Sequence, residues 1–410
     1  MQPLLSGSWS QVLLTAFMLT SAATLPSYGA AKGASQGQGQ QGGPAEAQQK
    51  AQQGPATDEQ GTQGEQGEQG DATALTSEKS RKVSRTFAVS ANQPYLLETR
   101  YGRVQINVWN RNEIRTDAEI ITHADTDQKA QQLQDMIDVQ MVRHDAASGG
   151  VAVRSKFGAI PHECWSRRRL YEVNYTVWLP KNTPLKVSNT FGEISISSDL
   201  TGSTELAVEY GALRTGRLEG SQNVLRVSNG QAAVPFARRA SIEASYSKLR
   251  LTEAVTVELR NNYSDIDMGT VQDLTMHSKY GDVALGTVRN LRGSSGFSTF
   301  SIDKINDRLD MKLQYCPSFE VRNTGKNFRQ INLDGGYSTI MLNFPDGAGF
   351  NFDVNTDHGK LLVDKKLIQV QSEESSASSS DMQGRFGGVV AKNAGNVNIK
   401  VRYGNVRFNR

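Results

Sequence analysis

The chain has 410 residues, which is long enough for two or three domains and ample for a hydrophobic core. Its formal net charge of +3 is too small to indicate a nucleic-acid partner. Composition excludes neither a binding protein nor an enzyme, so the elements along the chain have to carry the argument.

The N-terminus has the pattern of a secretory signal. The apolar run from Val12 to Thr20 is too short to span a bilayer comfortably, and small residues at Ser27, Gly29 and Ala30 offer cleavage sites. We therefore expect residues 1–31 to be a signal peptide. The chain would then be exported to the periplasm, the cell surface or the medium. No Lys or Arg precedes the apolar run, so an uncleaved anchor is the alternative.

A tether of low complexity follows. Residues 32–80 are mainly Gly, Gln, Ala and Glu, and such a segment buries too little apolar surface to offset the entropy of the chain. We expect a disordered linker there. No later apolar stretch has spanning length, so we expect no transmembrane segment in the mature chain.

Residues 81–185 combine strands with one helix. Alternating apolar residues predict strands at 86–89, 104–109 and 172–179, and a helix is expected over Asp125 to Met141. This region would cap the sheet edge of the repeats that follow, which repeat arrays need if they are not to polymerise. The apolar residues at helical spacing are Ala130, Leu133, Met136 and Ile137.

A repeat occupies residues 186–410. The segment YSDIDMG at 263–269 is followed 17 residues later by YGDVALG at 280–286. Most copies read aromatic, small, polar and then two aliphatic residues separated by one outward residue, which is the period of a half-buried strand. The copies begin at Phe191, Tyr210, Asn229, Tyr246, Tyr263, Tyr280, Phe297, Tyr337, His358 and Tyr403, with an isolated earlier one at Tyr101.

Each repeat also holds a second short strand, such as Val255–Leu259, and turn residues such as Gly269. Two strands and two corners make one coil of a flattened β-solenoid. The predicted fold is all-β, a β-helix-like parallel β-solenoid with about 17–20 residues per coil and a small N-terminal α+β cap. Coils stacked about 4.8 Å apart would share one core.

Four finer expectations concern the repeat region. The small residue after each aromatic is Gly or Ser, so we expect a limit on size there rather than a positive φ. The aromatics should lie at a corner or face outward, where they could stack from coil to coil. Lys248 should face Asp265, and Arg250 should face Asp267, across neighbouring strands. Residues 371–385, which are rich in serine, should form a polar loop.

The stretch from Val173 to Pro180, followed by Leu185 to Ile194, leads into the repeats. This pattern resembles a family of exported bacterial proteins with β-strand repeats, described as candidate adhesins and related to the head domains of candidate auto-transporter adhesins. The resemblance covers about residues 85–410. It implies the repeat architecture and an adhesin-like role at the surface, and it implies no catalytic residue.

Clustered carboxylates are the main candidate for chemistry. Asp265, Asp267 and Asp282 would share one outer face, as the acidic groups of β-helical polysaccharide lyases and hydrolases do. Lys248 and Arg250 already neighbour two of them, so a solvated face of mixed charge is the favoured interpretation. We therefore assign no catalytic, cofactor-binding or metal residue.

The cysteines offer neither a metal site nor a bridge. His162 and Cys164 lie close in sequence, but no second pair with metal spacing follows, and a zinc site needs about four ligands. Cys316 would lie several coils from Cys164, which is too far for a disulfide unless the N-terminal region folds back along the repeats.

Exposed basic, acidic and aromatic residues are the candidates for binding a partner. The basic cluster Arg167, Arg168 and Arg169 could meet an anionic partner, with a solvated hairpin loop as the alternative. The function we expect is a non-enzymatic envelope or surface protein that binds glycan, envelope polymer or protein, with no cofactor and no nucleic acid. The alternative is a carbohydrate-active β-helix enzyme. The candidate binding residues are Tyr246, Tyr263, Tyr280, Asp265, Asp282, Arg167, Arg168 and Arg169.

Overall fold

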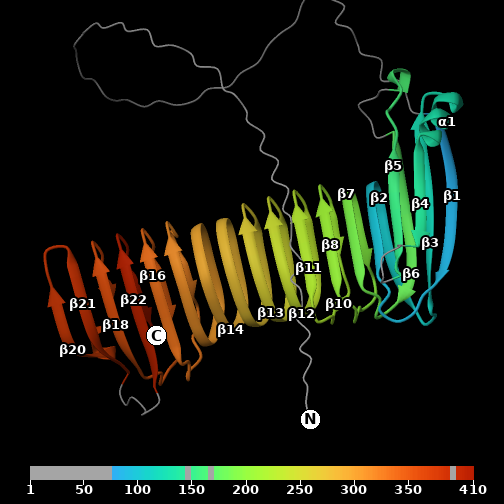
Figure 1. Ribbon diagram of the computed structural model, residues 1–410. Helices are drawn as coiled ribbons and strands as arrows, with labels where there is room; N and C mark the ends of the chain where they lie inside the picture. The colour runs from blue at the N-terminus through green and yellow to red at the C-terminus, as the bar shows by residue number, and fades with distance from the viewer. Residues whose placement is uncertain (1–75, 144–148, 165–169, 388–393) are drawn as a thin grey trace, which may run out of the picture. The chain divides into compact units, whose positions relative to one another are not determined.

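The computed structural model describes residues 76–143, 149–164, 170–387 and 394–410. The expected signal peptide, nearly all of the expected linker and the cluster 167–169 lie outside these ranges. The described chain is almost entirely β-strand, in one extensive sheet with a single α-helix, α1 (Asp127–Asp135) (Figure 1). Among the described residues, no helix has the length and apolar character that crossing a membrane requires.

The strands of the first half are β1 (Ser77–Ala88), β2 (Tyr95–Trp109), β3 (Glu113–Ala124), β4 (Ile137–Arg143), β5 (Val151–Phe157), β6 (Tyr171–Pro180), β7 (Leu185–Ile196), β8 (Thr204–Glu209), β9 (Ala212–Arg214), β10 (Arg217–Leu218), β11 (Asn223–Ser228) and β12 (Gln231–Ser245). Those of the second half are β13 (Lys248–Asn262), β14 (Asp265–Gln314), β15 (Phe319–Val321), β16 (Gln330–Gly336), β17 (Ile340–Asn343), β18 (Phe350–Asp357), β19 (Leu361–Leu362), β20 (Ile368–Ser375), β21 (Ser379–Phe386), β22 (Gly395–Arg402) and β23 (Val406–Asn409). Two 3-10 turns, His162–Cys164 and Lys365–Leu367, complete the described elements.

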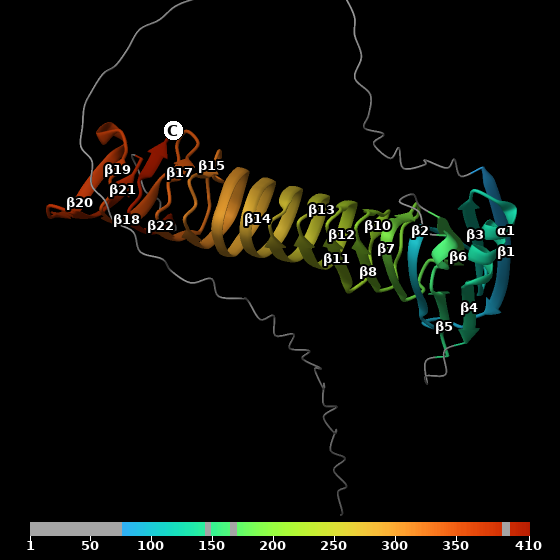
Figure 2. The same ribbon diagram turned by 90° about the horizontal axis from the view of Figure 1, so that it is seen from above.

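Successive repeats pair in parallel and in the predicted register. Leu249 of β13 lies opposite Ile266 of β14, and Lys248 lies opposite Asp265. β12 pairs with β13 in the same way. β14 is one extended segment that winds through several repeats (Figure 2). Because side chains alternate across a strand, every second residue points inward, and these residues form one continuous buried cluster.

The C-terminal strands do not follow chain order in space. β22 lies between β16 and β18 and pairs in parallel with both. Beyond β18, β21 and then β20 continue the sheet in antiparallel pairing. The expectation of a polar loop at 371–385 is therefore wrong. Most of these residues form the β20–β21 hairpin, whose outer strand β20 is exposed along nearly its whole length.

The N-terminal strands extend the stack. β2 pairs in parallel with both β6 and β7, so the isolated repeat at Tyr101 is part of the stack. β3 pairs antiparallel with β6, and β1 pairs antiparallel with β3. Two boundaries differ from the prediction. α1 ends at Asp135, since residues from Ile137 onward form β4, and β1 begins at Ser77, inside the expected linker.

Candidate binding site: the aromatic column

One corner of the stack is built on residues in the left-handed backbone conformation. All described non-glycine residues with positive φ occupy this corner, Asn92 excepted, and their φ lies between 49° and 60°. We call this row the aromatic column. Its members are Tyr101, Phe191, Tyr210, Asn229, Tyr246, Tyr263, Tyr280, Phe297, Tyr315, Tyr337, Tyr403 and His358.

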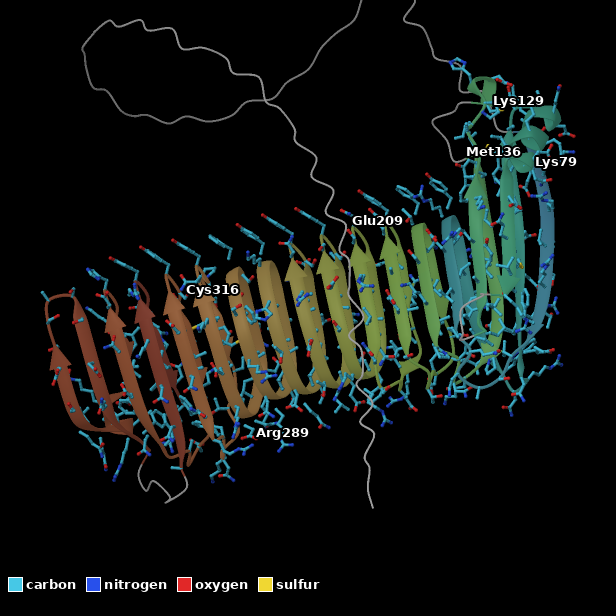
Figure 3. The ribbon with its side chains drawn as sticks, in the orientation of Figure 1. Lys79, Lys129, Met136, Glu209, Arg289 and Cys316 are labelled. Carbon is cyan, nitrogen blue, oxygen red and sulfur yellow. The ribbon has the colours of Figure 1, made fainter. Side chains whose placement is uncertain are left out.

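The same hydrogen bond supports this corner in repeat after repeat. The Tyr246 N–H donates to the carbonyl of Asn262 at 3.0 Å, and the Tyr263 N–H donates to that of Lys279 at 2.9 Å. Each acceptor directly precedes the next column residue. The backbone therefore turns the corner with its amide satisfied, and the side chain points away from the core (Figure 3, along the edge that carries Glu209 and Cys316).

The small residue that follows each column residue is limited by size, as predicted. A Cβ added at Gly192 would lie 1.8 Å from the Gly102 carbonyl oxygen, and one at Gly211 would lie 1.7 Å from that of Gly192. Serine is accepted where its hydroxyl is bonded, because Ser247 Oγ donates to the Ser245 carbonyl at 2.6 Å. Gly281 is an exception in this slot, since its φ is also positive, at 110°.

The rings stack from repeat to repeat. Centroids of successive rings lie 4.3–5.3 Å apart, at interplanar angles of 2–21°. Tyr246, Tyr263 and Tyr280, which the sequence singled out, are consecutive members. Stacked rings stabilise by about 0.5–1.5 kcal/mol per pair, which offsets much of the roughly 1–2 kcal/mol that a left-handed residue costs.

One member of the column is not among the repeats recognised from the sequence. Tyr315 stacks between Phe297 and Tyr337, at 4.8 and 4.9 Å. The signal was present, because Tyr315 follows Phe297 by 18 residues and is itself followed by a small residue, Cys316. Cysteine in the small slot and proline at the next position hid the pattern.

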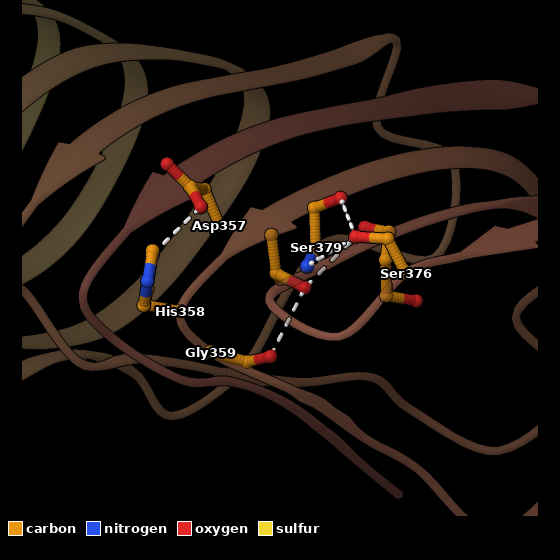
Figure 4. Close-up of polar contacts among 7 residues, drawn as sticks. Asp357, His358, Gly359, Ser376 and Ser379 are labelled. Carbon is orange, nitrogen blue, oxygen red and sulfur yellow. Dashed lines mark hydrogen bonds and ion pairs between the residues drawn. The ribbon is translucent and has the colours of Figure 1, made fainter.

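The column ends at a polar cluster beside the C-terminal hairpin. The His358 ring stacks on Tyr403, and His358 Nδ1 lies 2.8 Å from Asp357 Oδ1 (Figure 4). The hairpin turn is closed nearby by Ser376 and Ser379, whose hydroxyls lie 2.7 Å apart. Most rings of the column are 38–59% exposed, whereas Tyr101 and Tyr280 are half-buried.

A groove of about 1060 Å³ runs beside the column. Its floor includes the glycines of the small slot, and its wall is the first outward residue of each repeat. Tyr246, Tyr263 and Asp265 line it, so the structure brings three predicted binding residues together. The wall residues, in register from repeat to repeat, are Arg103, Glu193, Ala212, Gln231, Lys248 and Asp265.

The acidic candidates lie on the outer surface. Asp265, Asp267 and Asp282 are all exposed. Arg250 lies opposite Asp267 and forms an ion pair with it, with Nε 3.0 Å from Oδ2. No group of three acidic, His or Cys residues placed to hold a metal occurs among residues 76–143, 149–164, 170–387 and 394–410.

A second charged cluster lies away from the column. Asp307 is largely buried and receives two hydrogen bonds from the Arg329 guanidinium, with Arg289 Nε 3.7 Å away. The hydrogen bonds from Arg329 hold the pKa of Asp307 below its usual value, although burial opposes this. Paired in this way, the carboxylate serves to hold neighbouring repeats together.

Both cysteines are free and buried. Cys164 packs with Ala130 and Leu133 of α1, whereas Cys316 lies in the core of the stack. Burial raises the pKa of the Cys164 thiol, and neighbouring Glu163 adds to the rise. These thiols serve as small core residues rather than as a bridge.

Comparisons with known proteins give little. No protein-family model matches the chain, and no curated protein matches it. A candidate cell adhesion protein from Clostridium sporogenes is 10% identical, covering 81% of this chain and 99% of its own, with a TM-score of 0.18. Candidate adhesins from Bacteroides fragilis and Parabacteroides distasonis are each 10% identical, covering 80% of this chain and 97% of their own, with TM-scores of 0.25. TM-scores of this size do not establish a common fold.

Proposed function

We propose that the repeats form a parallel β-solenoid and that the protein is an exported, non-enzymatic binding protein of the cell envelope or surface. Its ligand is a glycan, an envelope polymer or a surface protein, held along the aromatic column and the groove beside it. The N-terminal pattern of a secretory signal supports export.

The exposure of the column carries this proposal. Tyr263 remains 45% exposed although rings stack on both its faces, and Tyr246 is 59% exposed. From Tyr246 to Tyr403 the rings make a contiguous apolar strip bordered by polar residues. Exposed strips of this kind mark interaction surfaces in soluble proteins. Aromatic residues also supply large contact area at a low cost in conformational entropy.

The test measures capture of envelope material. The mature chain is immobilised and incubated with purified envelope polymers and with a glycan array. We expect Tyr263→Ser combined with Tyr280→Ser to lose most of the captured material, because the strip is interrupted. Arg250→Ser, an exposed change in the same repeats, is the matched control and should retain it. Equal capture by both variants would refute the proposal.

The enzyme alternative has its own assay. Asp265→Asn combined with Asp282→Asn removes two of the exposed carboxylates that a lyase or hydrolase would need. We expect the chain lengths of incubated polysaccharides to be the same with the wild type and with this variant. Shortening by the wild type alone would favour the enzyme.

A further inference from the structure

The aromatic column lacks one ring. Asn229 occupies the position between Tyr210 and Tyr246, yet its backbone is that of its neighbours, with φ 50° and its N–H donating to the Ser245 carbonyl at 3.0 Å. The corresponding values for Tyr246 are 49° and 3.0 Å. The corner is therefore built for a ring, and only the side chain differs.

The missing ring leaves a slot of defined width. Tyr210 and Tyr246 are two repeats apart, so their rings are about 9.6 Å apart at the usual strand spacing. A six-membered ring centred between them would lie about 4.8 Å from each, which is the spacing of the column itself, 4.3–5.3 Å. Tyr246 is 59% exposed, more than the rings stacked on both faces, whereas Tyr210, at 49%, is exposed to the same extent as those rings.

The surroundings of the slot are polar. The groove reaches this position, since Ala212, Asn229, Gln231 and Tyr246 all line it. Asn229 Nδ2 donates to Ser228 Oγ at 3.1 Å, which leaves Oδ1 as an acceptor. Lys248 lies next to Gln231 in register. Asn229, Gln231 and Lys248 are exposed and line the same groove.

We propose that this slot binds one pyranose unit of a saccharide chain, an inference that rests on the proposed binding function. The two tyrosine faces stack on the C–H faces of the sugar ring, and the Asn229 and Gln231 amides bond hydroxyl groups at its perimeter. An aromatic side chain from a partner protein would fill the slot without bonding the Asn229 and Gln231 amides, which are exposed and would stay hydrated, whereas sugar hydroxyls bond them.

A matched pair of variants tests the slot. Asn229→Tyr supplies the missing ring and closes it, whereas Asn229→Ser keeps it open. The full mature chain is titrated with soluble hexasaccharides of β-1,4-linked glucose, β-1,4-linked N-acetylglucosamine and β-1,4-linked mannose, by calorimetry and saturation-transfer NMR. We expect at least one to bind the wild type, to bind Asn229→Ser a few-fold more weakly because the amide is lost, and to bind Asn229→Tyr at least tenfold more weakly than Asn229→Ser.

Folding and specificity are controlled separately. Asn229→Tyr should unfold at or above the wild-type temperature, because it completes a stack on an unchanged backbone. N-acetyltryptophanamide serves as the aromatic probe, and tighter binding of this probe than of any hexasaccharide, lost in Asn229→Tyr, would overturn the saccharide assignment.

Other outcomes separate the two proposals. If no hexasaccharide binds the wild type, or if Asn229→Tyr binds as well as the wild type does, the pyranose slot is wrong. Capture of envelope material that depends on Tyr263 and Tyr280 would still uphold the proposed function. Failure of that capture as well would refute both.

Discussion

Adjacent residues at the column corner meet two different steric demands. Tyr263 adopts φ 53°, which favours glycine or asparagine, and yet it carries a ring. Ser264, the next residue, is buried, with its hydroxyl donating to the Asn262 carbonyl at 3.1 Å. Strain at the first residue is offset by stacking on both ring faces, and the second must be small because the neighbouring repeat approaches it closely.

The small slot gives the first prediction. Gly211→Ala places a Cβ 1.7 Å from the Gly192 carbonyl oxygen, so the two repeats have to separate. We expect a loss of roughly 1–3 kcal/mol in the free energy of unfolding, measured with urea. Gly296→Ala is the control, because its Cβ meets nothing nearer than the Gln314 carbonyl oxygen at 3.9 Å. Equal losses in the two variants would contradict the steric explanation.

Tyr175 gives a prediction about pH. Its hydroxyl lies 2.6 Å from Ser155 Oγ, and burial raises its pKa to about 12 from the ordinary 10.0. Above pH 10 the unfolded chain loses this proton while the folded chain keeps it, so stability is complete below pH 10 and falls up to about pH 12. The shift is worth about 2–3 kcal/mol.

The measurement compares Tyr175→Phe with the wild type. Between pH 9 and pH 11 the wild type should lose more free energy of unfolding than Tyr175→Phe does, because only the wild type carries the Tyr175 hydroxyl. Tyr95, whose pKa burial also raises, is present in both chains and cancels. A constant difference across this range would show that Tyr175 does not titrate as the geometry requires.

At the scale of elements, the sheet edge at the C-terminal end of the stack carries its own protection against pairing. At the C-terminal end the outer strand is β20, which is exposed, polar and interrupted by a bulge between Val370 and Ser372. Bulges and charges prevent an edge from pairing with another chain. The serine-rich run is therefore suited to an edge strand, although its composition is also that of a loop.

The edge can be tested by removing its charges. Glu373→Val with Glu374→Val turns β20 into an apolar β-forming edge, so we expect self-association that grows with protein concentration in sedimentation velocity. Lys248→Val with Arg250→Val adds the same kind of surface within the paired part of the sheet. Its sedimentation should not depend on protein concentration. Association of the control alone would point to apolar area rather than to the edge.

Local sequence patterns set the limit of prediction at this scale. The period of two and the recurring length were sufficient to place Leu249 opposite Ile266. The spacing of Ile137 and Met141 fits either a continuation of the helix from Ala130 or a strand. The structure has the strand β4, because these residues pair with β5. β22 lies between β16 and β18, which are distant from it in sequence. Several strands share the same apolar alternation, so local patterns do not determine which of them β22 pairs with.

The column was only partly predictable. Stacking follows from aromatic residues recurring at one corner, so it could be expected from the sequence. The left-handed conformation could not, because tyrosine has no preference for it and the repeat context imposes it. The importance of Asn229 depends on that unchanged backbone, and it becomes visible only in the structure.

At the scale of the molecule, each repeat is stable only through its neighbours, and this makes the length of a repeat a quantity that can be tested. Deleting residues 248–264 removes one full step and joins Ser247 to Asp265. Gln231 would then face Asp265, and Ala232 would face Ile266, so inward residues still meet inward residues. We expect a folded chain with a single cooperative thermal transition and slightly lower stability.

Deleting residues 248–263, one residue fewer, is the matched control. Ser247 would join Ser264, and Ala232 would face Asp265 instead of an apolar residue. Because a shift of one residue moves every side chain to the opposite face, Asp265 and Asp267 would be driven into the core. We expect this variant to lose cooperative unfolding and much of its β-sheet circular dichroism. If both deletions fold equally well, the repeats do not share a continuous core, and the parallel stack is not what stabilises the protein.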